Sequence, residues 1–242
     1  MRRFRFRAAH HTVTGSAHQR RGVPCQDACS ARVMRRSQVI LVLADGAGSA
    51  RAGGLGAQTV VAAALRCADS ASAHDRTIAA RSALEALAES KNQPLRDFAT
   101  TFLVASLTRN RTNVSVETSQ IGDGVIVAGG AGDVVPLTLP DRGEHANETT
   151  FLTSDAWQHR LSEGSRDIPF GHGVMLMSDG PMSVLYDLRS QTVAPACGQM
   201  LDWGARHTAS HFTDALARSL EDVIAPETSD DCSIACAVGV LK

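Results

Sequence analysis

The chain has 242 residues, of which 43% are hydrophobic and 20% charged, as in an ordinary globular protein, and we expect a single domain over residues 1–242. Its net charge of −1 excludes a strong overall attraction to nucleic acid or to an anionic membrane, and we expect neither as a partner. No apolar stretch approaches the roughly 20 residues of a membrane span, and none of signal-peptide length follows the basic segment Met1–Arg7, so we expect a cytosolic protein.

The first third of the chain predicts two strands followed by two helices. Arg3–Arg7 alternates arginine with phenylalanine, which indicates a half-buried strand with an arginine face. Val39–Leu43 is a continuous apolar run, typical of a central strand that is covered on both faces, and it leads into Asp45-Gly46. We expect a helix rich in alanine and valine over Leu55–Cys67 and a weaker helix over Ile78–Glu89.

The middle of the chain predicts mainly strands. Phe98–Leu107 is strand-like, and Thr112–Gln120 alternates apolar with polar residues. Ile121–Gly124 interrupts the alternation before Val125–Val127 resumes it. We expect two strands that meet there at a bulge or tight turn, because glycine relaxes the limits on the backbone. The remaining elements expected in this part are a strand over Asp133–Leu139 and a polar loop over Pro140–Ser154.

The last third predicts a second central strand, an amphipathic helix and a closing strand. Val174–Met177 is apolar and ends at Ser178-Asp179-Gly180. Apolar residues then recur every four positions from Phe212 to Ile224, which is typical of an amphipathic helix, and Pro226 ends it. Ile234–Leu241 is strand-like. Because strands and helices come in blocks rather than in strict alternation, the sequence favours a layered α+β fold.

Short acidic motifs, most of them at the end of an apolar run, are the strongest functional signal. Burying an ionised carboxylate is costly unless it is paired or binds a cation, so several such groups indicate one shared site. Oxygen ligands suit Mg²⁺ or Mn²⁺, and two such ions can activate a water and hold a phosphoryl group. Taken singly, each motif is more typical of a turn or a helix cap. The motifs are Gln26-Asp27, Asp45-Gly46-Ala47-Gly48, Gly122-Asp123-Gly124, Ser178-Asp179-Gly180 and Asp230-Asp231.

Cysteine and histidine pairs offer a competing metal chemistry, which we do not favour. Cys25 and Cys29, like Cys232 and Cys236, are four residues apart on or beside predicted strands, where the two sulfurs lie too far apart to share a zinc ion. We expect reduced, packed thiols. His207 and His211 have the spacing of one helix face, and without a third ligand nearby we expect a solvated face.

In this order, the acidic motifs resemble those of the metal-dependent Ser/Thr protein phosphatases of the PP2C type. The resemblance runs from about Gly15 to the C-terminus and covers most of the chain. Two further segments, Gly15–Ala28 and Gly143–Thr153, resemble a bacterial branch of that family. The resemblance implies a four-layer αββα sandwich with two central antiparallel sheets flanked by helices and with metal ions in a cleft at one edge.

The resemblance also implies roles for individual residues. Family members attack the phosphate ester with a metal-bound hydroxide and form no phosphoenzyme. Asp123 matches the position of a third, weaker metal in bacterial relatives. The residues implied as ligands of the two principal Mg²⁺ or Mn²⁺ ions are Asp27, Asp45, Asp179, Asp230 and the Gly46 carbonyl.

Departures from the family pattern leave some assignments open. The final Asp-Asn pair of the family reads Asp230-Asp231 here; we favour Asp230 as the ligand, with Asp231 as its rival. The phosphate-binding arginine of the family is off its usual spacing. We choose Arg21 over Arg20, since a guanidinium binds phosphate oxygens with two hydrogen bonds. His18 is a candidate proton donor to the leaving alkoxide.

These residues predict a phosphatase that acts on phosphoserine or phosphothreonine in proteins. Asp45, Arg21 and His18 are the candidate catalytic residues. The resemblance implies a phosphoprotein substrate and, as a partner, a Ser/Thr kinase or its targets. The alternative is a catalytically silent relative that binds a phosphoprotein or kinase partner as a scaffold, which the altered last motif and the displaced arginine motivate.

Overall fold

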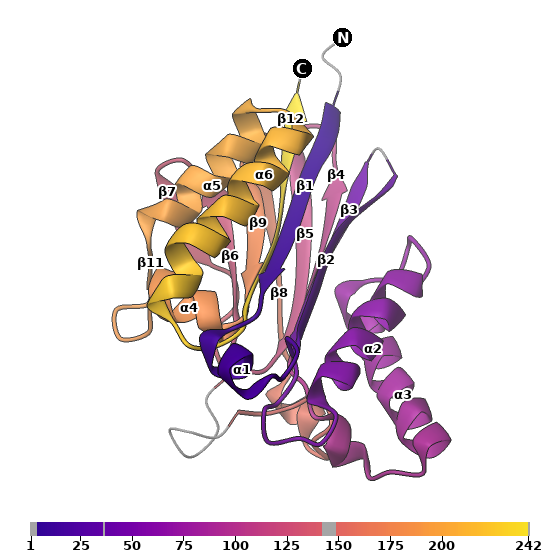
Figure 1. The fold of residues 1–242 in the computed structure, drawn as a ribbon. Coiled ribbons are helices and arrows are strands. Elements are labelled where there is room, and N and C mark those ends of the chain that lie inside the picture. The colour runs from indigo at the N-terminus through magenta and orange to yellow at the C-terminus, as the bar shows by residue number, and fades with distance from the viewer. Residues whose placement is uncertain (1–3, 36, 142–148, 242) are drawn as a thin grey trace.

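The computed structural model describes residues 4–35, 37–141 and 149–241, and its main strands form two stacked antiparallel sheets (Figure 1). In spatial order, the first sheet contains β1 (Phe4–Val13), β12 (Cys232–Leu241), β9 (Gly173–Met177), β6 (Val125–Gly130) and β7 (Asp133–Pro136). The second contains β2 (Asp27–Arg35), β3 (Gln38–Asp45), β4 (Phe102–Arg109), β5 (Asn113–Ile121) and β8 (Ser162–Pro169). A short hairpin pairs β10 (Tyr186–Asp187) with β11 (Thr192–Val193).

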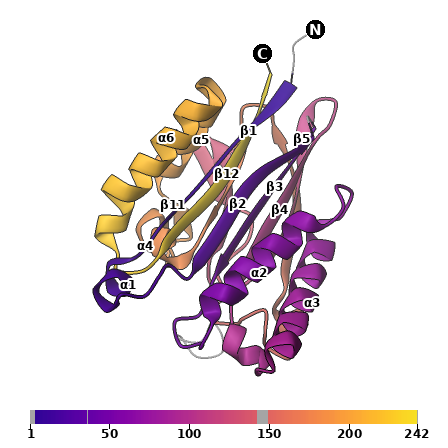
Figure 2. The same ribbon diagram turned by 45° about the vertical axis from the view of Figure 1, so that its right-hand side comes forward.

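Helices cover the outer face of each sheet and form the connections near one end (Figure 2). The α-helices are α1 (Ser16–Arg21), α2 (Gly53–Arg66), α3 (Ala73–Lys91), α4 (Asp179–Leu185), α5 (Pro195–Arg206) and α6 (Ala209–Ser219). The other helical turns are the 3₁₀ segments η1 (Leu95–Phe98), η2 (Trp157–Arg160) and η4 (Ala225–Glu227) and the π-helix η3 (Leu220–Ile224). In the part of the chain that the structure describes, none of the helices combines the length and the apolar character needed to cross a membrane.

The packing of β3 explains why its sequence is apolar throughout. Val39, Leu41 and Leu43 face the core between the two sheets. Ile40 and Val42, on the opposite face, pack beneath α2 and α3. Strand residues alternate between the two faces of a sheet, so a strand in the middle of a four-layer stack is buried on both. On the other side, α5 and α6 cover the first sheet. The predicted αββα sandwich is confirmed.

Several predicted elements differ from the observed ones. Thr112–Gln120 and Val125–Val127 lie in different sheets, so the glycines between them form a crossover from one sheet to the other rather than a bulge in one sheet. The edge strand β8 was not predicted, because its sequence is polar and most of it is exposed. His207 ends α5 and His211 lies in α6, so the two residues do not share a helix face, although their rings are 4.6 Å apart.

Arg7 is buried, contrary to the expected arginine face. Its side chain is 6% exposed, whereas Arg5 is exposed. The Arg7 guanidinium donates hydrogen bonds of 2.7 and 2.8 Å to the carbonyls of Gly204 and Ala205, in the last turn of α5. Helix C-termini leave carbonyls without partners inside the helix, and a cation there is favourable. Arg7 therefore fastens α5 to β1.

We expect the substitution Arg7→Ala to lower the free energy of unfolding by about 1–3 kcal/mol, because it leaves buried carbonyls of α5 without their donor. Arg5→Ala is the matched control on the exposed face of the same strand and should stay within about 0.5 kcal/mol of the wild type. Urea unfolding followed by circular dichroism measures both. Equal losses would show that Arg7 contributes no more than a surface arginine.

Candidate active site

The pairing of the strands brings the acidic motifs to one end of the two sheets. In the β2–β3 pair Asp27 lies directly opposite Asp45, so the two side chains leave the same face of the sheet as neighbours. The end of β9 pairs with the beginning of β12 and of β6. Asp179 begins α4 two residues after the end of β9, Asp230 lies just before β12 and Asp123 just before β6. Residues far apart in sequence thus converge.

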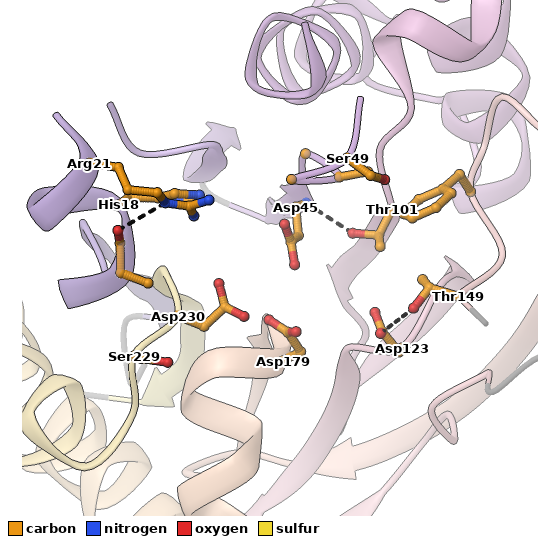
Figure 3. Close-up of a pocket in the computed structure, with 15 residues that line it drawn as sticks. His18, Arg21, Asp45, Ser49, Thr101, Asp123, Thr149, Asp179, Ser229 and Asp230 are labelled. Carbon is orange, nitrogen blue, oxygen red and sulfur yellow. Dashed lines mark hydrogen bonds between the residues drawn. The ribbon is translucent and has the colours of Figure 1, made fainter. Parts of the chain in front are cut away.

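The converging segments enclose a pocket of about 300 Å³. The carboxylates that line it are those of Asp45, Asp123, Asp179 and Asp230. Figure 3 shows His18 and Arg21 extending from α1 toward Asp45, with Asp230 and Asp179 below them. One wall therefore carries negative charge and the other carries a guanidinium and an imidazole. Such a pocket suits an anionic ligand that is held together with cations.

Threonine hydroxyls fix the backbone of Asp45 at the end of β3, and Gly46 packs closely against the start of α2. The Asp45 amide donates a 2.9 Å hydrogen bond to Thr101 Oγ1, and Thr100 Oγ1 donates one of 2.9 Å to the Asp45 carbonyl. A Cβ atom at Gly46 would come within 2.3 Å of the carbonyl carbon of Gly53 at the start of α2. Only glycine fits this close approach between the end of β3 and the start of α2.

The carboxylates of the pocket repel one another. Burial, followed by the charges of Asp27 and Asp179, raises the pKa of Asp45 well above its ordinary value. Burial and the charges of Asp230 and Asp123 raise the pKa of Asp179 to about 6, although a hydrogen bond with Asp45 opposes the shift. Bound cations would relieve this repulsion and return these groups to the ionised form.

The donors present fit hard divalent cations. They are carboxylate oxygens, and Oδ1 of Asp179 is buried without a hydrogen-bond partner among the described residues. Across residues 4–35, 37–141 and 149–241, no three acidic, histidine or cysteine side chains are gathered closely enough to form a ready-made metal site. A cation would therefore bind between facing carboxylates together with backbone oxygen and water.

Asp27 lies beside Asp45 but is not part of the pocket wall. It is 6% exposed, and its Oδ2 accepts a 2.8 Å hydrogen bond from Ser178 Oγ, while Oδ1 has no partner within the described part of the chain. Burial raises the pKa of Asp27 to about 7, even though hydrogen bonds from Ser178 and Ser233 act in the opposite direction. Its predicted role as a ligand stays a prediction.

The two aspartates of the last motif have different environments. Asp230 lines the pocket. Asp231 is 2% exposed, and its carboxylate accepts hydrogen bonds from the amides of Gly15 (2.7 Å) and Gln26 (2.6 Å) and from Nδ1 of His18 (2.9 Å). Burial opposes ionisation of Asp231, but these hydrogen bonds together hold its pKa below the ordinary value. Of the two, only Asp230 lines the pocket, and its role as a metal ligand stays a prediction.

The two arginines of α1 also differ. Arg21 lines the pocket, and its Nε donates a 3.1 Å hydrogen bond to the carbonyl of Ala17. Arg20 Nη1 donates to Ser16 Oγ at 3.2 Å, outside the pocket lining. Of the two candidates for binding phosphate, Arg21 has the better position.

Sequence reasoning did not single out Thr101, Thr149 and Phe151, which also line the pocket. Thr149 Oγ1 donates a 2.6 Å hydrogen bond to Oδ2 of Asp123 (Figure 3). The segment 143–153, which carried part of the family resemblance, was the signal that could have led to Thr149 and Phe151. Its residues 143–148 lie outside the described residues. Thr101 had no such signal, because its position depends on the pairing of β3 and β4.

The cysteines do not form a zinc site in the described part of the chain. All six are free thiols, as expected. Cys29 lies beside Thr12, whose hydroxyl is 3.2 Å from the sulfur, and Cys236 Sγ contacts the carbonyl of Ala9. Burial raises the pKa of Cys29 to about 11, so its thiol stays protonated near neutral pH. These are packed thiols rather than metal ligands.

Comparison with known proteins reveals sequence relatives of the chain. A family model described as Protein phosphatase 2C matches residues 14–224. The protein named Serine/threonine-protein phosphatase 3 from Escherichia coli (strain K12) is 34% identical over 191 residues, which cover 72% of this chain and 73% of that protein. Both findings confirm the resemblance inferred from the ordered acidic motifs.

Solved structures share the fold at lower sequence identity. The catalytic domain of the serine threonine protein phosphatase PstP, in complex with 2 manganese ions, has 17% sequence identity and a TM-score of 0.67, with 98% of this chain and 99% of that chain covered. PppA, described as a key regulatory component of T6SS in Pseudomonas aeruginosa, has 18% identity and a TM-score of 0.66, with 98% of each chain covered. At these identities the similarity establishes the fold alone.

The raised pKa values predict how the stability of the metal-free protein depends on pH. Asp179 and Asp27 titrate near 6 and 7 in the folded state, against an ordinary value of 3.8. Between the ordinary pKa of 3.8 and these raised values, the folded state therefore binds more protons than the unfolded state. The free energy of unfolding should fall as pH rises from about 4 to about 7. Mn²⁺ added at pH 8 should restore stability, which a thermal melt measures.

The substitution Asp179→Asn provides the matching test. It removes one of the repelling charges, so the metal-free variant should melt about 2–4 °C higher for each kcal/mol of repulsion relieved, and its response to Mn²⁺ should shrink. Asp214→Asn, at an exposed position of α6, is the control and should change neither quantity. A variant Asp179→Asn that melts lower than the wild type without metal would contradict the repulsion.

Proposed function

This chain belongs to the protein phosphatase 2C family, and on that premise we propose that it hydrolyses phosphoserine and phosphothreonine in proteins, with Mg²⁺ or Mn²⁺ as its cofactor. The observation that carries the proposal is the pocket in which four distant carboxylates face an arginine and a histidine. The relative from Escherichia coli, named as a serine/threonine-protein phosphatase, and the manganese-bound PstP structure support the same activity.

The acidic side of the pocket would hold the cations. Asp45, Asp179 and Asp230 would supply carboxylate oxygens. Gly46, which also lines the pocket, would supply its backbone carbonyl oxygen. Asp27 lies outside the pocket lining and would bind a cation through Oδ1, which has no hydrogen-bond partner among the described residues. Asp123, the fourth carboxylate that lines the pocket, would bind a third, weaker cation. When bound, such cations lower the pKa of water and neutralise the charge on a phosphoryl group.

Two residues of α1 would act on the phosphate ester. Arg21 would bind the phosphoryl oxygens, where a guanidinium offers two parallel hydrogen bonds. Water would attack phosphorus in line with the leaving oxygen, forming one P–O bond as the bond to the serine oxygen breaks. His18 would give a proton to that oxygen, and a proton from the attacking water would replace it. The products are the free alcohol and inorganic phosphate.

We also propose the partners that this reaction implies. The substrate is a phosphoprotein. A Ser/Thr kinase would add the phosphate that this protein removes, so such a kinase or its targets would be its partners. Two neighbours with the same fold have titles that mention regulation. One is PppA, a key regulatory component of T6SS, and the other is from the bacterial stressosome, described as a modular system adapted to control secondary messenger signaling. We do not favour the alternative of a catalytically silent scaffold, because four of the five acidic motifs contribute a carboxylate to the pocket.

The activity itself is the first prediction. With Mn²⁺ the protein should hydrolyse p-nitrophenyl phosphate and a phosphothreonine peptide, and EDTA should abolish both reactions. Asp45→Ala should lower kcat/KM by at least about 100-fold, since it removes a charge at the centre of the pocket. Hydrolysis that survives EDTA or Asp45→Ala would contradict the proposal. A folded protein that binds no Mn²⁺ at millimolar concentration in a calorimetric titration would favour the scaffold.

The two arginines of α1 give a matched pair for the next prediction. Arg21→Ala should lower kcat/KM about 10- to 150-fold, the equivalent of losing a charged hydrogen bond worth about 1.5–3 kcal/mol. Arg20→Ala should leave kcat/KM close to that of the wild type, because Arg20 binds Ser16 outside the pocket. Steady-state kinetics with the phosphothreonine peptide measures both. Equal losses in the two variants would remove Arg21 from the phosphate site.

A further inference from the structure

Asp231 and His18 form a buried pair at the edge of the pocket. The Nδ1 atom of His18 is 2.9 Å from Oδ2 of Asp231, and their side chains are 10% and 3% exposed. The same carboxylate accepts hydrogen bonds from the amides of Gly15 and Gln26, so three donors, two at α1 and one just before β2, fix its orientation. A carboxylate held in this way cannot rotate away from the imidazole ring.

This contact determines which nitrogen of His18 serves the pocket. An ionised carboxylate accepts but does not donate, so Nδ1 must carry a hydrogen. The other ring nitrogen, Nε2, forms no hydrogen bond with any described residue, and His18 lines the pocket. When the ring takes up a second proton, that proton can only be on Nε2. After giving it away, the ring returns to the neutral form with hydrogen on Nδ1.

We propose that Asp231 is a positioning residue that presents Nε2 of His18 to the leaving oxygen, so that the pair delivers the proton on which release of the serine or threonine alcohol depends. The proposal rests on the proposed phosphatase function. It explains why the last acidic motif carries a second aspartate that does not line the pocket. It also accounts for the buried histidine in a helix as short as α1.

Substrates with different leaving groups distinguish this role from a structural one. p-Nitrophenolate leaves without a proton, whereas the alkoxide of serine needs one. His18→Gln should therefore lower kcat for a phosphoserine peptide about 100- to 10,000-fold, with a much smaller effect on p-nitrophenyl phosphate. Asp231→Asn should show the same selectivity, with a loss of about 10- to 100-fold on the peptide. A variant Asp231→Asn that loses both activities equally would overturn the proposal.

A double variant tests whether Asp231 acts through His18. If it does, His18→Gln combined with Asp231→Asn should be no slower on the peptide than His18→Gln alone, within about twofold, because linked residues are not additive. Multiplied losses would overturn the proposal. The control is Glu221→Gln, which breaks the surface pair between His11 Nε2 and Glu221 Oε1 (2.7 Å) and should change neither activity.

A spectroscopic measurement tests the pair without catalysis. In the metal-free protein with ¹⁵N-labelled histidine, the neutral ring of His18 should carry its hydrogen on Nδ1, and Asp231→Asn should shift the hydrogen toward Nε2. A wild-type ring with hydrogen on Nε2 would overturn the pair even in an active enzyme. Conversely, a wild-type protein that shows the Nδ1 form but hydrolyses neither substrate would overturn the proposed function, and the proton-delivery role with it.

Discussion

Mutual repulsion among closely placed carboxylates is the constraint around which one end of this molecule is built. The fold places acidic side chains from separate connections around a single pocket. Burial, and then the charges of neighbouring carboxylates, raise the pKa values of Asp45 and Asp179. Left alone, such a cluster costs stability. Cations bound between the carboxylates would offset that cost.

The antiparallel pairing of the strands supplies the rigidity that this repulsion demands. Asp27 and Asp45 leave directly opposed positions of β2 and β3, and the hydrogen bonds of the ladder hold them there. Thr100 and Thr101, just before β4, then fix the backbone of Asp45 from the other side. The carboxylates cannot move apart without breaking a sheet whose two faces are both covered. The stability of the whole sandwich thus maintains the charge cluster.

The sequence predicts the layers and the acidic cluster better than it predicts the edges. A continuous apolar run such as Val39–Leu43 has one physical interpretation in a layered fold, because only a doubly covered strand needs it. β8 has no such pattern. Within the described residues it pairs with one strand only and is mostly exposed, so its residues need not be apolar. The crossover at Gly122 was misjudged because local glycine chemistry is the same for a turn within a sheet and between sheets. Thr149 reaches Asp123 only through tertiary contacts.

The basic wall of the pocket depends on the same frame in a less obvious way. α1 spans six residues, too few for a helix to be stable by itself, and Gly22 ends it in the left-handed conformation at φ 65°. Its position is imposed from outside: the amide of Ala17 bonds to the carbonyl of Ser229, and the carboxylate of Asp231 binds the backbone on both sides of the helix. The segment that carries Asp230 into the acidic wall therefore also anchors His18 and Arg21 in the opposite one. A displacement of this segment would move both walls together, so the spacing across the pocket is set by one short connection before β12.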